Sequence, residues 1–184
     1  MPRKKHSSRS KKPLSRPARK SRAHVRKRSQ LPFVLKRILV PIDFSEHSKN
    51  ALKYAVPFAK QFKAEIILVY VVEPAVYPAD FSFGQFGFPN AEDEFREKGE
   101  EELAALVEKE IRKEVKARRQ VRTGKAFVEI LKTAQEEEVD LIIIATHGHS
   151  DVEHMLFGST AEKVVRKAPC PVLSLRPDER EFVK

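Results

Sequence analysis

The stretch VDLIIIATHGHSDVEHMLFGSTAEKVVRKAPCPVLSL, from Val139 to Leu175, decides how this chain folds. It starts as an apolar strand, continues through a polar loop around Gly148, opens a helix at residues 158–160 and ends in a second short strand. Small residues at the end of a strand, followed by a glycine-opened helix with free backbone N–H groups, suit a phosphate group. The alternative is that these small residues serve only tight packing.

Strand and helix patterns alternate along the chain from residue 35 onward. Short apolar or β-branched runs predict strands at 37–42, 64–72, 118–124, 139–145 and 171–175. Amphipathic patterns predict helices at 46–62, 92–116, 125–138 and 159–168. This alternation indicates an α/β fold, a doubly wound parallel sheet of five strands with four helices, whose ligand sites lie beyond the carboxyl ends of the strands.

Two residues inside the helical patterns have consequences for local structure. Pro57 lies within the helix 46–62 and is expected to kink it or to mark a distorted turn, because proline lacks the N–H that a helix needs. Phe95 is placed on the apolar stripe of the helix 92–116, whose many charged residues are expected to form a solvated face.

The formal net charge of +10 is unevenly distributed. Residues 1–30 carry 13 Lys and Arg without Asp or Glu, whereas residues 31–184 carry 23 Lys and Arg against 26 Asp and Glu. We expect residues 1–34 to be a disordered basic tail, residues 35–176 to form one domain and residues 177–184 to be a polar tail. The basic tail either attracts nucleic acid non-specifically, or is a solvated extension without a partner, a transit peptide or the product of a mis-assigned start codon.

Composition also bears on compartment and partners. No apolar run approaches the roughly 18 residues of a membrane span, so no membrane association is expected. The single Cys170 cannot form a disulfide within the chain, which fits a cytoplasmic location. Residues 73–91 hold four phenylalanines and three prolines, and could form an edge strand, a lid, a partner-facing patch or a cluster packed on the domain.

Several linked segments resemble the universal stress protein (UspA-like) family across residues 35–176. They are ILVPIDFSEHSKNALKYA, AEIILVYVVEP, EEEVDLIIIATHGHSD and GSTAEKVVRKAPCPVLSL. The resemblance implies an α/β fold of strand order 3-2-1-4-5, a cytoplasmic role in the stress response and a homodimer paired through the last strand, Pro171 to Leu175. The ATP-binding branch of the family carries the motif G-x2-G-x9-G-[ST], whose loop holds the phosphates.

The resemblance implies that the following residues bind ATP. Pro41, Ile42 and Asp43 would line the nucleoside pocket, and Val71 would meet adenine through its backbone. The phosphates would be held by the loop and the helix start, namely Ala145, Thr146, His147, Gly148, His149, Gly158, Ser159 and Thr160. A Mg²⁺ ion could enter with ATP, held by Asp43 or Ser159. The chain departs from the family pattern where Ala145 replaces the first glycine, Ile42 replaces a common Thr and Asp151 replaces a loop glycine.

Other chemistry finds little support in the pattern. His147, His149 and His154 do not share a helical face and lack a supporting Cys or carboxylate, so no metal site is predicted. No P-loop lysine, Ser-His-Asp order or paired carboxylate is recognisable, so ATP hydrolysis is expected to be slow or absent. Two functions stay open: a nucleotide-binding regulatory module, and a dimeric interaction module without nucleotide, tethered to nucleic acid by residues 1–30.

Overall fold

The computed structural model describes residues 34–74, 91–111, 114–148 and 158–176. The chain divides into two compact units, Met1–Pro32 and Phe33–Lys184. The first unit, which holds the basic tail, lies outside the described residues, as do the phenylalanines at 81–88, Asp151 and residues 177–184. Every helix and strand described belongs to the second unit.

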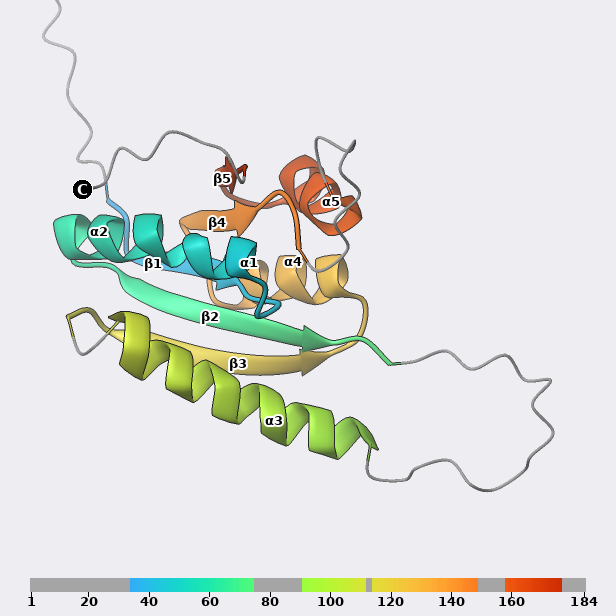
Figure 1. Ribbon diagram of the computed structural model, residues 1–184. Helices are drawn as coiled ribbons and strands as arrows, with labels where there is room; N and C mark the ends of the chain where they lie inside the picture. Colours follow the sequence, from blue (N-terminus) through green and yellow to red (C-terminus); the bar gives the residue numbers. More distant parts are fainter. Residues whose placement is uncertain (1–33, 75–90, 112–113, 149–157, 177–184) are drawn as a thin grey trace, which may run out of the picture. The chain divides into compact units, whose positions relative to one another are not determined.

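The second unit is built on one parallel sheet in the order β3-β2-β1-β4-β5 (Figure 1). Its strands are β1 (Arg37–Pro41), β2 (Glu65–Val72), β3 (Ala117–Thr123), β4 (Leu141–Ala145) and β5 (Val172–Leu175). The predicted fold class and strand order are confirmed, and each strand lies within two residues of its predicted bounds.

A helical connection joins each strand to the next. The helices are α1 (Glu46–Asn50), α2 (Leu52–Phe62), α3 (Ala91–Leu106) followed by the π-helical turn η1 (Val107–Ile111), α4 (Ala126–Glu136) and α5 (Ser159–Lys167). The first three helices cover one face of the sheet, and α4 and α5 cover the other. In the described ranges, no helix is long and apolar enough to cross a membrane.

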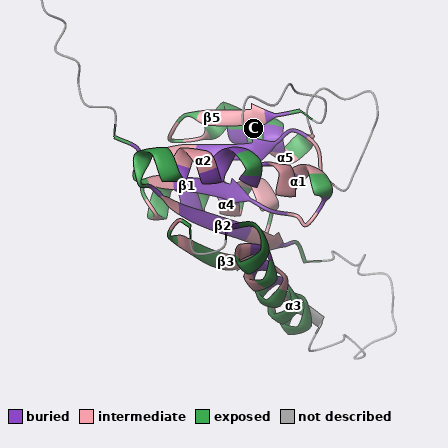
Figure 2. Cartoon of the chain, turned by 60° about the vertical axis from the view of Figure 1, so that its left-hand side comes forward, coloured by how far each residue is buried: buried purple, intermediate pink, exposed green. Residues whose placement is uncertain are grey.

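The hydrophobic core is divided between the two faces of the sheet. Because side chains alternate along a strand, Ile38, Ile66 and Leu68 pack beneath α1, α2 and α3, whereas Leu39, Ile67 and Ile142 pack beneath α4 and α5. All six are fully buried, and burial of each side chain contributes about 1.5–3 kcal/mol. Figure 2 shows the central strands as buried and α3 as mostly exposed along its length.

The first predicted helix is divided, but at Ala51 and not at Pro57. α2 continues through Pro57, whereas Ala51 separates α1 from α2. The Ala51 N–H donates to the Ser48 carbonyl at 3.2 Å, a bond only three residues back, so the helix tightens there before α2 begins. Ser48 also accepts the Asp43 N–H at 3.3 Å through its hydroxyl, which ties α1 to the end of β1.

The helix predicted at 92–116 ends earlier than predicted, in a π-helical turn. α3 passes into η1, and β3 already begins at Ala117. Leu106 and Ile111 are both buried although they lie five residues apart, and a π-helical turn brings such positions onto one face. Phe95 was predicted on the apolar stripe, but it is 57% exposed because it borders an open cavity at the end of the sheet.

Gly99 lies inside α3, where glycine costs about 1 kcal/mol of helix stability relative to alanine. The Tyr70 ring on β2 requires it, because a Cβ at residue 99 would lie 2.5 Å from the ring atom Cδ1. Phe44 holds the same ring from another side, with the two ring centroids 4.7 Å apart. The contact between Gly99 and Tyr70 therefore sets how closely α3 approaches the sheet.

We expect Gly99→Ala to lower the free energy of unfolding by about 1–3 kcal/mol, because the overlap with Tyr70 outweighs the gain in helix propensity. Urea unfolding followed by circular dichroism measures this change. In a Tyr70→Ala background, which removes the ring, the same substitution should be neutral or stabilising. Equal destabilisation in both backgrounds would contradict the role given to Tyr70.

Candidate functional site

A cavity of about 770 Å³ opens at the carboxyl end of the sheet. Its walls come from the ends of β1, β2 and β4, from the chain after β4 and from the first turn of α5. Residues of α3 and α4 border it on the two faces of the sheet. Strand order reverses here, because β1 lies between β2 and β4, and parallel sheets bind ligands at this point.

Every predicted site residue within the described ranges lines this cavity: Pro41, Ile42, Asp43, Val71, Ala145, Thr146, His147, Gly148, Gly158, Ser159 and Thr160. His149 lies outside the described residues. The sequence prediction missed the other lining residues: Phe44, Ser48, Val69, Tyr70, Glu73, Phe95, Lys98, Gly99, Glu102, Ala126, Ile130, Ile144 and Ala161. Strand alternation could have indicated Tyr70, and its place directly after β2 could have indicated Glu73. The lining residues on α3 carry no such signal, because their position at the cavity depends on how that helix crosses the sheet.

Asp43 is fixed by the turn that ends β1. Its Oδ1 accepts hydrogen bonds from the Ser45 N–H at 3.0 Å and from the Ser45 hydroxyl. Ser45 also caps α1, because its hydroxyl oxygen accepts the Ser48 N–H at 3.1 Å. The second carboxylate oxygen of Asp43 lies against Gly148, where any Cβ would overlap it. Asp43 thus brings β1 and the chain after β4 together, and position 148 requires glycine.

Phe44 and Tyr70 form an aromatic wall beside Asp43. Phe44 has a φ of 65°, a left-handed conformation that costs energy for a bulky side chain and that clusters at functional sites. This conformation turns the chain sharply from β1 toward α1 and directs the Phe44 ring onto Tyr70. Burial raises the pKa of the Tyr70 phenol, and the carboxylates of Glu102 and Asp43 raise it further.

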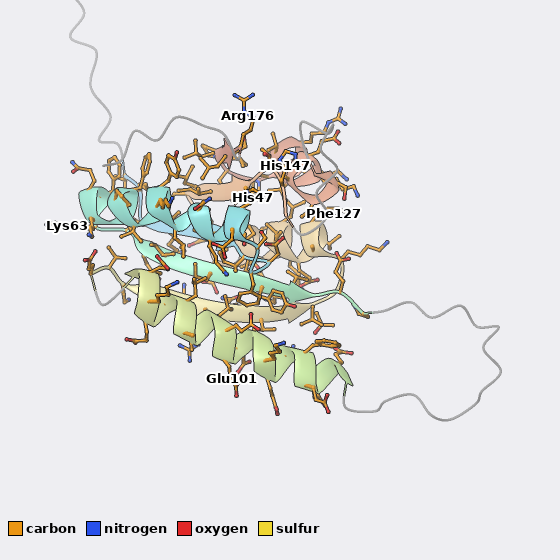
Figure 3. The ribbon with its side chains drawn as sticks, viewed as in Figure 1. His47, Lys63, Glu101, Phe127, His147 and Arg176 are labelled. Atoms are coloured by element: carbon orange, nitrogen blue, oxygen red, sulfur yellow. The ribbon has the colours of Figure 1, made fainter. Side chains whose placement is uncertain are left out.

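Thr146 holds the end of β4 and is itself buried. Its N–H donates to the Leu175 carbonyl at 2.8 Å, and its hydroxyl donates to the same carbonyl at 3.1 Å. The Thr146 carbonyl accepts the Gly158 N–H at 2.7 Å, which brings the start of α5 to the end of β4. His147, labelled in Figure 3, lies beside this junction with Nδ1 2.9 Å from the Thr146 hydroxyl.

The N-termini of two helices reach the cavity, and they differ in charge. Among the described residues, no side chain caps α5, whose N-cap is Gly158. At α4, by contrast, the Glu73 carboxylate accepts the Ala126 N–H at 2.6 Å. A helix N-terminus favours negative charge, and Glu73 already supplies it at α4. An anionic group entering the cavity would therefore be drawn to α5.

Val71 lies beyond the paired part of β1. The Glu65 N–H donates to the Lys36 carbonyl at 2.8 Å, and the Val69 carbonyl accepts the Ile42 N–H at 2.9 Å. Alternate residues of β2 therefore direct their backbone groups toward β1. Val71 continues this alternation, but the register of β1 with β2 ends at Pro41 opposite Val69. The N–H and C=O of Val71 therefore face the cavity edge, where a planar ligand could hydrogen-bond to them.

The sequence pattern of the universal stress protein family matches residues 35–176, which include the whole cavity lining. The chain belongs to the universal stress protein family. This confirms the predicted family. Universal stress protein MJ0531 of Methanocaldococcus jannaschii is 32% identical over 149 residues, covering 79% of this chain and 85% of that protein.

Solved structures of universal stress proteins share the fold of this chain. Protein MJ0577 of Methanocaldococcus jannaschii matches with a TM-score of 0.65 and 29% identity, covering 80% of this chain and all of that one. A universal stress protein from Archaeoglobus fulgidus, solved in complex with dAMP, matches with a TM-score of 0.54 and 22% identity. The match covers 77% of this chain and 98% of that one.

We expect the Tyr70 phenol to ionise at a higher pH than a free tyrosine, for which the ordinary value is 10.0. The folded state disfavours the phenolate, so the free energy of unfolding should fall as pH rises through the unfolded pKa. Tyrosinate absorbance of the protein and of Tyr70→Phe isolates this group by difference. Glu102→Gln should move the Tyr70 pKa back toward its ordinary value, and a Tyr70 titration unaffected by folding would refute the assignment.

Proposed function

We propose that this chain is a regulatory module of the stress response that binds an adenine nucleotide, with ATP as the ligand, and hydrolyses it slowly or not at all. The observation that carries the proposal is the open N-terminus of α5 at the rim of a cavity in which the other helix N-terminus is already neutralised by Glu73. Backbone N–H groups at a helix start bind phosphate without any basic side chain.

The base end of the ligand fits the opposite side of the cavity. Val71, Ala126 and Ile130 line an apolar surface between β2 and α4, suited to a planar base. The outward backbone groups of Val71 offer one donor and one acceptor beside it. The dAMP-bound relative supports an adenine nucleotide as the class of ligand, since it shares this fold.

The phosphate end of the cavity accommodates Ala145, one of the departures from the family motif. The side chain of Ala145 is buried at the end of β4, where its methyl group is part of the wall. Ser159 and Thr160 add hydroxyl groups at the first turn of α5, and Asp43 is the nearby carboxylate that could hold a Mg²⁺ ion arriving with ATP. Since Asp43 is also engaged by Ser45, we assign it to positioning and not to proton transfer.

Analysis of small molecules released from the denatured, purified protein tests the proposal directly. We expect adenine nucleotide in the released fraction, or a rise in melting temperature when ATP and magnesium are added to the nucleotide-free protein. Absence of both would refute nucleotide binding and favour the interaction module without nucleotide.

We expect Ser159→Asp to weaken ATP binding about ten-fold or more, because a carboxylate at the first turn of α5 repels the phosphates. The same carboxylate favours the helix dipole, so the free energy of unfolding should stay constant or rise by about 0.3–1 kcal/mol. Calorimetric titration with ATP and urea unfolding separate the two effects.

Val128→Asp is the matched control for Ser159→Asp. Val128 is 41% exposed in the first turn of α4 and does not line the cavity, so this variant adds the same charge elsewhere. It should leave ATP affinity unchanged. Equal losses of affinity in the two variants would show that overall charge, and not the start of α5, governs binding.

We also propose that two copies of the chain pair through β5. This strand is one edge of the sheet. The carbonyls of Pro171 and Leu175 accept hydrogen bonds from β4. Because backbone groups alternate in direction along a strand, those of Val172 and Ser174 point to the open edge. An open strand edge is a template for pairing with a second strand.

Ser174→Pro should convert the proposed dimer to a monomer, because it removes an outward N–H and leaves the bonds between β4 and β5 intact. Light scattering coupled to size exclusion measures the mass, and Ser174→Ala should remain dimeric. A monomeric wild-type chain, or a Ser174→Pro variant that stays dimeric, would refute pairing through β5.

A further inference from the structure

β3 forms the opposite edge of the sheet and is longer than β5, with seven residues against four. The Lys116 carbonyl accepts the Ile66 N–H at 2.8 Å, and the Gly124 N–H donates to the Val72 carbonyl at 3.0 Å. The even-numbered residues of β3 therefore direct their backbone groups toward β2. Odd-numbered residues therefore direct their backbone N–H and C=O groups outward, namely Ala117, Arg119, Val121 and Thr123. These groups form a regular row of donors and acceptors.

A groove of about 900 Å³ follows this edge. Every residue of β3 lines it, together with Arg96 and Glu100 of α3 on one side and Glu129 of α4 on the other. Since α3 and α4 cover opposite faces of the sheet, the groove is a slot with a strand edge at its base. An extended peptide that adds a strand to a sheet needs this shape.

The groove is lined by charged side chains of both signs. It holds four arginines, at positions 96, 118, 119 and 122, against the two glutamates at 100 and 129. Two of these arginines are already paired: Arg118 with Glu65 at 3.2 Å and with Glu137 at 2.8 Å, and Arg122 with Glu136 at 2.6 Å. Arg119 is exposed, and within the described part of the chain no ion pair engages it. Arg119 is thus the cation best placed to meet an incoming acidic group.

These charges decide between the occupants that could use an open edge. Two copies of β3 would bring two sets of arginines together, and like charges oppose such pairing. For nucleic acid, the groove lacks aromatic side chains for base stacking, and its glutamates oppose a continuous phosphate backbone. An extended segment with acidic side chains satisfies both the backbone row and the arginines.

We propose that the β3 edge is a docking site for an acidic, extended peptide segment of a partner protein, which adds a sixth strand to the sheet. Main-chain hydrogen bonds to Arg119, Val121 and their odd-numbered neighbours supply affinity, and Arg96 and Arg119 select acidic side chains. The site is distinct from the nucleotide cavity, so the proposal stands whether or not ATP is bound.

The test uses the full chain and a fluorescein-labelled peptide of alternating glutamate and threonine, of seven residues to match β3. The control peptide has the same sequence with every backbone nitrogen methylated, which keeps the charge and removes the donors. Residues 1–30 attract both peptides equally through their charge, so the difference between the peptides reports strand pairing. By fluorescence anisotropy, we expect the unmodified peptide to bind about ten-fold or more tightly than the methylated one.

Variants of Arg119 separate charge from hydrogen bonding. Arg119→Ala should weaken binding of the unmodified peptide, Arg119→Pro should weaken it further by removing an outward N–H, and Arg119→Glu should weaken it most. Arg166→Glu is the matched control, since Arg166 is exposed on α5 outside the groove. It should have no effect.

Two results would overturn the proposal. Equal binding of the two peptides would show attraction by charge alone, and equal losses in Arg119→Glu and Arg166→Glu would exclude the groove. If labelled oligouridylate binds in the groove, with loss in Arg119→Glu, while the peptides do not differ, the edge is a nucleic-acid surface and the peptide proposal is wrong.

Discussion

The central strand β1 is paired on both edges, and the chain leaves β1 and its neighbour β4 toward opposite faces of the sheet. That divergence opens the cavity, and the contact between Asp43 and Gly148 holds the two departing segments together at its base. The turn at Phe44, the cap at Ser45 and the junction between Thr146 and Gly158 belong to the same two departing segments. A side chain at position 148 would push the two walls of the cavity apart.

The two helix N-termini that reach the cavity differ in charge. Glu73 neutralises the start of α4, whereas Gly158 leaves the start of α5 open. In the complex that we propose, the phosphates lie at the start of α5 and the base lies beside Val71. This pose agrees with the regulatory role that we propose.

The strands, their order and one side of the cavity lining could be predicted, because each depends on a local pattern or a family motif. Apolar runs located β1, β2 and β4, and the motif around Gly148 and Gly158 located one side of the cavity. The break at Ala51, the π-helical turn after Leu106 and the exposure of Phe95 could not be predicted, because they arise from how helices pack on the sheet. The place of Glu73 directly after β2 could have indicated a lining residue, but not its bond to Ala126, which lies far away in sequence.

Amide chemical shifts of the isotope-labelled full chain, recorded by NMR while ATP is added, test the central claim most directly. ATP is a polyanion, so it could bind either in the cavity or to the basic residues 1–30. The account predicts shifts at Val71, Gly148 and Gly158 to Thr160 that saturate together and persist at high salt. Shifts confined to residues 1–30 and abolished by salt would contradict it.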